Sequence, residues 1–378
     1  MSLKFWLPDM PITDSISKNL DLSGKWIILI QHWVRDAIDF GLMMKNNSNA
    51  DVLFLPKPYS QNLTDISYGI ENWLKIQNPW YDYENWLEKE GFLEGVLQNF
   101  KNRELIIIEV WGMFANIFNE KPELAKWVSW LVEITTFWHN RHLKSNTNDI
   151  LTTYSVARSP IKESEAKHVW LAVYRSLDKV LHEMNRAIVD CNITMVWYGM
   201  IWQNVCRAFS LCKWVNVFDK DMNKVLEAEN DWYNSSIDYT DVVNDSDIII
   251  ASTGFRSIDS EFISNCKNWV LLVSAWSRQN EIDVEYLEKN TTEDILELNS
   301  YIKRYFIWWK EIYLFRDWKN ANFSWNSCPS NSMDLIHAET LYCVWNILKW
   351  KINNVWWINE TTKEERNELF KLHKDYWK

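Results

Sequence analysis

Short apolar runs alternate with longer polar stretches along the first part of the chain. The apolar runs lie at 26–32, 51–57, 104–110 and 130–136. Segments such as 61–77 and 84–102, which separate these runs, are polar and compatible with helices. Short apolar runs are typical of strands buried on both faces, and the helical segments between them give the βα rhythm of a parallel sheet. The pattern therefore predicts a first α/β domain.

A second series of apolar runs follows a long amphipathic segment. Residues 161–187 place apolar side chains at roughly helical spacing and predict one long helix. The strands predicted after it lie at 193–199, 215–221, 246–254, 269–275 and 311–317. Their separation fits consecutive βαβ units. The charged segment 325–378 is predicted to be mostly helical.

The composition is unusual in two residue types. The 378 residues include 26 Trp but only 8 Gly, whereas glycine ordinarily makes up about 7% of a protein. Several Trp residues stand where turns are expected, as in "FIWWKEIYLFRDWKNANFSW", which reads as a pair of strands joined by turns if Trp is replaced by Gly. Some genetic codes read UGA as tryptophan and at least one reads it as glycine. We therefore hypothesise that many of the printed Trp residues are Gly; the alternative is a genuinely Trp-rich protein.

Charge and cysteine content narrow the classes of function. The net charge is −11, which does not attract nucleic acid or an anionic membrane surface. The sequence shows no apolar run of membrane-spanning length and no signal-peptide pattern. The six Cys form no CxxC pair and no zinc spacing, and are expected to be reduced thiols. We expect a cytoplasmic protein, and also a homo-oligomer, without a nucleic-acid or membrane partner.

The stretch "MVWYGMIWQNV" at 195–205 has the rhythm of a dinucleotide-binding loop. Such a loop needs G-x-G-x-x-G between a strand and a helix, because small residues permit the tight turn and the close approach of backbone to pyrophosphate. Trp197, Gly199 and Trp202 have this spacing, and glycine at 197 and 202 would give "GYGMIG". We predict that the cofactor contacts this loop, which includes Met200 and Ile201.

An acidic residue is expected about 20 residues farther on, where it accepts hydrogen bonds from the adenosine ribose. Asp219, in "VNVFDKD", lies at that distance from Gly199. A carboxylate there repels the 2′-phosphate of NADP, so NAD is the predicted cofactor. The alternative is an ordinary βαβ turn in which Asp219 is a solvated strand end.

Together these segments resemble the S-adenosylhomocysteine hydrolase family from about residue 25 to residue 330. "VWYGMIWQNVCRAF" is similar to that family's strand–GYG–helix segment, and "ASTGFRSI…NWVLLVSAWSRQNEID" to its "ATG…NEID" stretch. "WVSWLVEITTFWH" is similar to its "GI.G.sEETTTGvh" segment. The resemblance implies two doubly wound α/β domains: a Rossmann NAD-binding domain over 166–324, and a flavodoxin-like substrate domain formed by 1–165 and 325–378.

The resemblance also implies roles for individual residues. Thr253, Gly254 and Trp276 would line the nicotinamide side of the cofactor site. Glu133 falls on the family's catalytic, ribose-binding glutamate, and His32 on an active-site histidine. Asn322 and Cys328 fall on substrate-binding positions, where Cys328 replaces a histidine.

Two departures from the family pattern concern proton transfer. Arg158 replaces the catalytic lysine, and an arginine binds hydroxyl groups or anions but does not release its proton. Met113 stands where the family has an aspartate. His139 and His142 lack a third metal ligand nearby in sequence, so no metal site is predicted.

Three functions fit these observations. The first is hydrolysis of S-adenosylhomocysteine or a related nucleoside by transient oxidation of the substrate with NAD. The second is NAD-dependent oxidation of another hydroxy substrate. The third is a non-catalytic protein that binds NAD as a regulatory ligand. Glu133 and His32 favour an enzyme that acts on a small nucleoside-like molecule.

Overall fold

The computed structural model describes residues 9–57, 63–77, 91–110, 112–135, 139–140, 142–143, 151–199, 208–275, 281–315, 321, 328–349 and 358–377. The chain forms two compact units, one made of Met1–Glu165 with Pro329–Lys378 and the other of Ala166–Cys328. The boundaries predicted from the sequence lie after residues 165 and 324. Within the described residues, no helix combines the length and the apolar character that a membrane span needs.

The first unit is built on a parallel sheet in the order β3-β2-β1-β4-β5-β6. The strands are β1 (Lys25–His32), β2 (Asp51–Lys57), β3 (Lys75–Ile76), β4 (Glu104–Glu109), β5 (Trp130–Glu133) and β6 (Thr153–Ser155). Without the two-residue β3, this is the flavodoxin-like order; with β3, it is the Rossmann order. In both descriptions the strand order reverses between β1 and β4.

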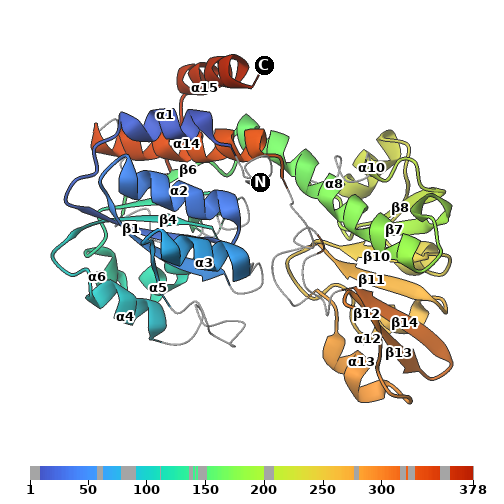
Figure 1. The fold of residues 1–378 in the computed structure, drawn as a ribbon. Helices are drawn as coiled ribbons and strands as arrows, with labels where there is room; N and C mark the ends of the chain where they lie inside the picture. Colours follow the sequence, from blue (N-terminus) through green and yellow to red (C-terminus); the bar gives the residue numbers. More distant parts are fainter. Residues whose placement is uncertain are drawn as a thin grey trace, which may run out of the picture. The chain divides into compact units, whose positions relative to one another are not determined.

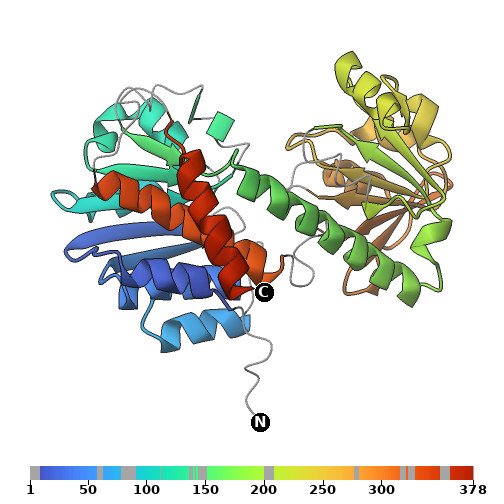
Figure 2. The same ribbon diagram turned by 90° about the horizontal axis from the view of Figure 1, so that it is seen from above.

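Helices cover both faces of this sheet. They are α1 (Pro11–Lys18), α2 (Arg35–Asn46), α3 (Leu63–Glu71), α4 (Phe92–Gln98), α5 (Met113–Glu120), α6 (Pro122–Ala125), α14 (Ser330–Leu348) and α15 (Lys363–Tyr376). α1 and α14 are far apart in sequence but lie side by side (Figure 1). α15 lies across α14 (Figure 2). Its N-terminus is closed by a capping box between Thr362 and Glu365.

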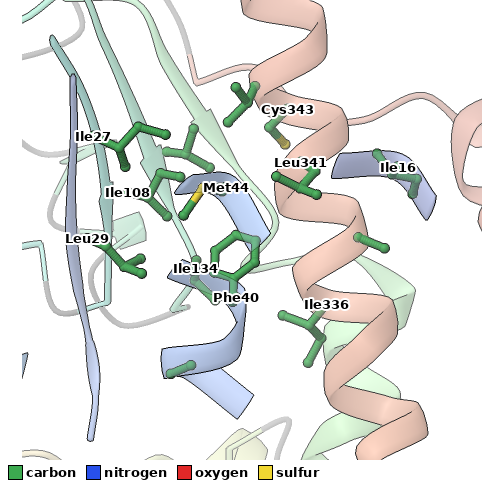
Figure 3. Packing of buried hydrophobic residues seen from close by; sticks show 14 of the residues in the cluster. Ile16, Ile27, Leu29, Phe40, Met44, Ile108, Ile134, Ile336, Leu341 and Cys343 are labelled. Atoms are coloured by element: carbon green, nitrogen blue, oxygen red, sulfur yellow. The ribbon is translucent and has the colours of Figure 1, made fainter. Parts of the chain in front are cut away.

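The alternation of side chains along β1 divides the core of this unit into two layers. Ile27 and Leu29 pack with α2 and α14, whereas Ile28 and Ile30 pack with α4 and α5. Figure 3 shows the first layer, in which Ile27 and Leu29 lie on the same side of the sheet as Phe40 of α2. Burial on both faces explains why these strands are continuous apolar runs.

The second unit is built on an eight-stranded sheet in the order β12-β13-β14-β11-β10-β7-β8-β9. Its strands are β7 (Asn192–Val196), β8 (Trp214–Phe218), β9 (Asn234–Ser236), β10 (Ile248–Ala251), β11 (Val270–Ser274), β12 (Leu296–Asn299), β13 (Ile302–Ile307) and β14 (Lys310–Phe315). The order from β9 to β14 follows the Rossmann pattern and reverses between β7 and β10. β12 and β13 are antiparallel additions at one edge. The predicted fold class, α/β with two doubly wound domains, is confirmed.

The helices of the second unit lie between consecutive strands. The long α8 (Pro160–Glu183) leads into it, after which follow a 3₁₀ turn (Ile188–Asp190), α10 (Met222–Asn230), α11 (Thr240–Val243), α12 (Ser260–Asn265) and α13 (Val284–Asn290). The series of predicted strands omits the six-residue β13, and it also omits β3, β6, β9 and β12, which have two to four residues each. β9, with the sequence Asn-Ser-Ser, carries no apolar signal at all.

Candidate functional site

The parallel strands bring polar side chains to one edge of the first sheet. β1 ends at His32, β2 at Lys57, β4 at Glu109, β5 at Glu133 and β6 at Ser155. The register pairs His32 with Lys57, Glu109 with Glu133, and Glu133 with Ser155. Ligands of doubly wound sheets bind outside the carboxyl ends of the strands, where the strand order reverses. This edge, beside the reversal between β1 and β4, is therefore the candidate active site.

Glu109 and Glu133 are fully buried and bind the backbone at the start of α5. Glu109 Oε2 accepts hydrogen bonds from Met113 N (2.8 Å) and Phe114 N (3.3 Å). Glu133 Oε2 accepts one from Gly112 N (3.0 Å). Gly112 has a φ of 53°, a left-handed conformation that glycine adopts without strain. The helix N-terminus, with its free N–H groups and positive dipole end, thus faces two carboxyl groups.

His142 completes a buried group of three side chains. Its Nε2 lies 3.2 Å from Glu109 Oε1 and 3.8 Å from Glu133 Oε2, and all three residues are fully buried. Glu133 Oε1 accepts hydrogen bonds from the backbone N and the hydroxyl of Thr135, both at 2.6 Å. Backbone and side-chain donors thus surround both carboxyl groups.

Two buried carboxyl groups this close together do not both ionise easily. Burial, and secondarily the charge of Glu109, raise the pKa of Glu133 to about 8 from an ordinary value of 4.5. Glu133 is therefore mostly protonated at neutral pH and exchanges its proton near physiological pH. A group with such a pKa suits general acid–base catalysis.

The Glu109–Glu133–His142 group also has the composition of a metal site. One ligand atom from each residue lies within 4.8 Å of the others, and no other such group occurs in the ranges that the structure describes. His142 has no third ligand nearby in sequence, but Glu109 and Glu133 come to it from β4 and β5. The absence of a metal site stays a prediction.

His32 lies at the same sheet edge, beside two lysines. Packing removes water from most of its ring, and the ammonium groups of Lys57 and Lys162 repel a further positive charge, so the pKa of His32 falls well below its usual range. His32 is consequently neutral at physiological pH and able to accept a hydrogen bond. Lys57 is almost completely buried, whereas Lys162 pairs with Glu165 at 2.5 Å.

Arg158 lies in the loop between β6 and α8, close to His139. Its guanidinium is exposed and donates a hydrogen bond to Asn140 Oδ1. The ring of His139 lies 2.9 Å from Ser155 Oγ, and burial together with the charge of Arg158 lowers the pKa of His139 to about 4. Arg158 is thus a cation at the edge of the candidate site. Its predicted role at the active site, where it replaces the family's lysine, stays a prediction.

The carboxyl edge of the second sheet holds the predicted cofactor residues that the structure describes. Trp197 follows β7 and Asp219 follows β8. The buried Asp219 carboxylate accepts hydrogen bonds from Tyr198 N (2.6 Å) and Asp221 N (2.9 Å), and therefore fastens the loop after β7 to the end of β8. The indole of Trp197 meets Phe255 edge to face, with ring centroids 5.8 Å apart.

Thr253 and Gly254 follow β10 at this edge and are held by a second buried carboxylate. Glu281 Oε1 accepts hydrogen bonds from Thr253 N and from Gly254 N (3.1 Å), and its Oε2 accepts one from Ser274 Oγ (2.7 Å). Burial raises the pKa of Glu281. The structure thus brings Trp197, Asp219, Thr253 and Gly254 to one sheet edge, beside the reversal of strand order.

Of the remaining predicted residues, the structure describes only Gly199 and Cys328. Met200, Ile201, Trp202, Trp276 and Asn322 lie outside the described residues. Gly199 is described and follows Tyr198 in the loop after β7. Cys328 is half-buried immediately before Pro329 and α14. Its assignment to substrate binding stays a prediction.

Comparison with known proteins gives a distant relative. No family model matches the chain. The chain is 27% identical over 198 residues to the S-inosyl-L-homocysteine hydrolase of Methanopyrus kandleri. That alignment covers 51% of this chain and 46% of the relative, so the chain matches about half of the relative's length. It supports a relationship to S-adenosylhomocysteine hydrolase-like proteins without assigning a substrate.

Solved structures with a similar arrangement share little sequence with this chain. A dipicolinate synthase polypeptide from Bacillus halodurans has a TM-score of 0.48 and 12% identity, and the match covers 85% of this chain and 98% of that one. The corresponding dipicolinate synthase polypeptide from Bacillus subtilis has a TM-score of 0.46 and 11% identity, with 88% and 99% covered. Similarities this weak carry no argument about function.

Sequence reasoning missed Glu109, Lys57 and Glu281. Glu109 and Lys57 each lie at the end of an apolar run, where a charge is expensive to bury unless it is paired. That position was the available signal for Glu109 and Lys57, which end β4 and β2. Glu281 lies in the "NEID" stretch quoted for the family resemblance, but sequence alone did not indicate that it holds the Thr253–Gly254 turn.

The raised pKa of Glu133 predicts a pH-dependent stability. Below pH 4.5 this carboxyl is protonated in both the folded and the unfolded chain. Between 4.5 and about 8 only the folded chain holds the proton, so the free energy of unfolding should fall by about 1.4 kcal/mol per pH unit over this range. In the Glu133→Gln variant, denaturant unfolding measured from pH 5 to pH 8 should show that this part of the slope is lost.

The exposed Glu123 supplies the matched control for that experiment. Glu123→Gln should leave the slope of the parent chain unchanged. The assignment fails if Glu133→Gln keeps the parent slope, whatever its absolute stability.

Proposed function

We propose that this chain is an NAD-dependent enzyme that acts on S-adenosylhomocysteine, or on a related nucleoside thioether, by transient oxidation of the substrate. The observation that carries the proposal is the Glu133 carboxyl, buried at the carboxyl edge of the first sheet with a pKa of about 8. Support comes from the resemblance to S-adenosylhomocysteine hydrolases and from the distant similarity to S-inosyl-L-homocysteine hydrolase.

The backbone at the second sheet edge fits a dinucleotide. Asp219 lies at the end of β8, where the adenosine ribose is bound in Rossmann domains, and its oxygens retain lone pairs beyond the backbone hydrogen bonds they accept. The loop after β7 and the Thr253–Gly254 turn lie beside it. When bound there, NAD would supply a hydride acceptor. Among the described residues of this loop, the misfit is the side chain of Trp197, which occupies the position of the loop's first small residue.

The residues of the first sheet edge have different roles in proton transfer and substrate binding. Glu133 holds a proton at neutral pH and can give it up near pH 8. The neutral His32 can accept a hydrogen bond from a substrate hydroxyl, but its lowered pKa makes it a weaker base than an ordinary histidine. Arg158 can bind a ribose hydroxyl or the amino-acid carboxylate of the substrate, but it cannot transfer a proton. Removal of a hydrogen next to an oxidised carbon, followed by loss of the thiol, therefore depends on Glu133 and His32.

A second candidate function is oxidation of a hydroxy substrate without cleavage. The replacement of a lysine and an aspartate by Arg158 and Met113 favours it, because each general acid–base group typically contributes about 10²- to 10⁴-fold in rate. Met113 is buried in the core, with only its backbone N directed to Glu109.

A single assay separates these functions. The chain, with glycine at 197, 202 and 276, is incubated with NAD and either S-adenosylhomocysteine or S-inosylhomocysteine, while free thiol and NADH absorbance are recorded. We expect NADH formation, and thiol release slower than in ordinary S-adenosylhomocysteine hydrolases. Glu133→Gln should lower the rate of NADH formation by about 10²-fold or more, and the matched Glu123→Gln variant should not.

Fast thiol release would show that Arg158 and Met113 are adequate replacements. NADH formation without thiol would support oxidation alone. The absence of both signals, with NAD bound, would contradict action on these two substrates and favour oxidation of another hydroxy substrate or a regulatory NAD-binding protein.

The cofactor assignment is tested at Asp219. Asp219→Ala should weaken NAD binding by roughly 10- to 100-fold, because charged hydrogen bonds to the ribose hydroxyls are lost. NADP binding should weaken less, because the repulsion of its 2′-phosphate is lost as well. Both affinities are measured by calorimetric titration.

Asp219→Asn provides the control for loop integrity. It keeps an acceptor for the loop after β7 but removes the negative charge, so it should also shift preference towards NADP. Equal losses for both cofactors in both variants, or a parent chain that binds NADP more tightly than NAD, would contradict the assignment.

A further inference from the structure

Tryptophan is over-represented among residues with left-handed backbone. Eight non-glycine residues in the described chain have a positive φ, and five of them are Trp: Trp73 (64°), Trp197 (93°), Trp232 (69°), Trp269 (73°) and Trp308 (58°). The other three are Asn49, Asn102 and Asn185. Asparagine is the usual non-glycine residue in this region, whereas for bulky side chains a positive φ is an outlier.

The effect is specific to tryptophan and is not shared by other aromatic residues. The chain has 16 Phe and 15 Tyr, and none of those that the structure describes has a positive φ. Phe, Tyr and Trp have similar backbone preferences, since their side chains branch beyond Cβ. A physical reason for placing Trp alone at such positions is therefore lacking.

Two of these Trp residues end helices in the motif that most strongly favours glycine. After α3, Trp73 N donates to Ile70 O and Leu74 N donates to Gly69 O. After α10, Trp232 N donates to Glu229 O and the next residue donates to Ala228 O. Both are Schellman motifs with Trp at the left-handed position, where glycine is usual and Asn occurs.

The C-terminus of a third helix, α8, has the same motif with a different residue at the left-handed position. After α8, Asn185 N donates to His182 O and Arg186 N donates to Leu181 O, which is the same pair of hydrogen bonds. This helix ends with one of the two residue types that the motif prefers, whereas α3 and α10 end with Trp.

The hairpin between β13 and β14 also has a Trp at a position that favours glycine. Ile307 pairs with Lys310, so Trp308 and Trp309 form a two-residue turn, and Trp308 has a φ of 58°. Two-residue hairpin turns require a positive φ at their first central position and therefore favour Gly or Asn.

Burial of the indole rings does not compensate for the unfavourable left-handed backbone at these Trp residues. Trp232 is 95% exposed and Trp73 is 81% exposed, and Trp269 and Trp308 are each more than half exposed. A large apolar side chain that stays in water contributes little stabilising free energy. The left-handed backbone at these Trp residues is therefore unfavourable, and burial of the indole does not offset it.

Trp197 is the case that concerns the candidate cofactor site. Three loops described above are each held by a buried carboxylate that accepts a backbone N–H at or next to a left-handed residue. In two of them this residue is a glycine: Gly112 beside Glu133, and Gly254 beside Glu281. In the third, next to the Tyr198 N–H that Asp219 accepts, it is Trp197.

We infer that positions 73, 197, 232, 269 and 308 carry glycine in the protein as its own cells make it, because the codons printed here as tryptophan are read there as glycine. Glycine at these five positions would change the counts from 26 Trp and 8 Gly to 21 Trp and 13 Gly, which removes part of the imbalance. The inference stands on backbone geometry and does not need the proposed function. At position 197 it extends that function, because a glycine there removes the indole from the turn that would face a dinucleotide pyrophosphate.

Peptide mass spectrometry of the protein isolated from its natural cells tests the inference directly. Peptides that span the five positions should have the masses of glycine-containing sequences, and the gene should have UGA at each of them. Tryptophan masses at these positions would overturn the inference, whatever the activity assays show.

Stability measurements on the full-length recombinant chain give an independent test. Trp73→Gly and Trp232→Gly should each raise the melting temperature by about 2–4 °C, because a strained left-handed residue is relieved. Asn185→Gly, in the same motif, should change it little. Trp33→Gly, at an indole that is buried in the core, should lower it. A fall in melting temperature for Trp73→Gly and Trp232→Gly, like that for Trp33→Gly, would contradict the inference.

Discussion

Buried carboxyl groups that accept backbone N–H groups determine the loops at the carboxyl edge of each sheet. In the first unit, Glu109 and Glu133 accept from the start of α5. In the second, Asp219 and Glu281 accept from the loops after β7 and β10. A carboxyl group buried in this way is costly unless donors surround it, and the donors must come from a loop of defined shape. The shape of each loop and the chemistry of its carboxyl group therefore depend on each other.

This dependence has a chemical and a conformational consequence. Because Glu133 lies beside Glu109 and away from water, it retains its proton to about pH 8, which gives the first sheet edge an acid–base group that works near neutrality. Because the N–H groups must turn towards the carboxylates, the loops include left-handed residues, at 112, 197 and 254. A position of this kind tolerates glycine well and tryptophan poorly, so the loop geometry itself indicates which residue belongs at 197.

Much of the fold could be predicted from the sequence, because strands buried on both faces are written as continuous apolar runs. β1 and β2 follow the predicted runs closely, and α8 covers nearly all of the predicted long helix. The polar β9 and the two-residue β3 are strands only because neighbouring strands pair with them, which local sequence does not record. The predicted doubly wound class did not depend on these short strands.

The candidate site was predictable in part. Spacing selected Trp197 and Asp219 as candidates, and family resemblance selected Glu133. Glu109 and His142 were not assigned to a site, because their significance arises from the meeting of β4, β5 and a distant loop. Glu281 likewise reaches the Thr253–Gly254 turn from another element. Contacts of this kind depend on the register of a sheet, and no local pattern in the sequence encodes them.

The central claim is that the loop after β7 is a dinucleotide-binding turn that needs a small residue at 197. Calorimetric titration of NAD into the chain with Trp197, and into the same chain with Trp197→Gly, tests it most directly; Trp232→Gly, at a left-handed position after α10, is the matched control. The account predicts that Trp197→Gly binds NAD at least about tenfold more tightly, equivalent to about 1.4 kcal/mol, and that Trp232→Gly does not. Equal or weaker binding by a folded Trp197→Gly chain would contradict it.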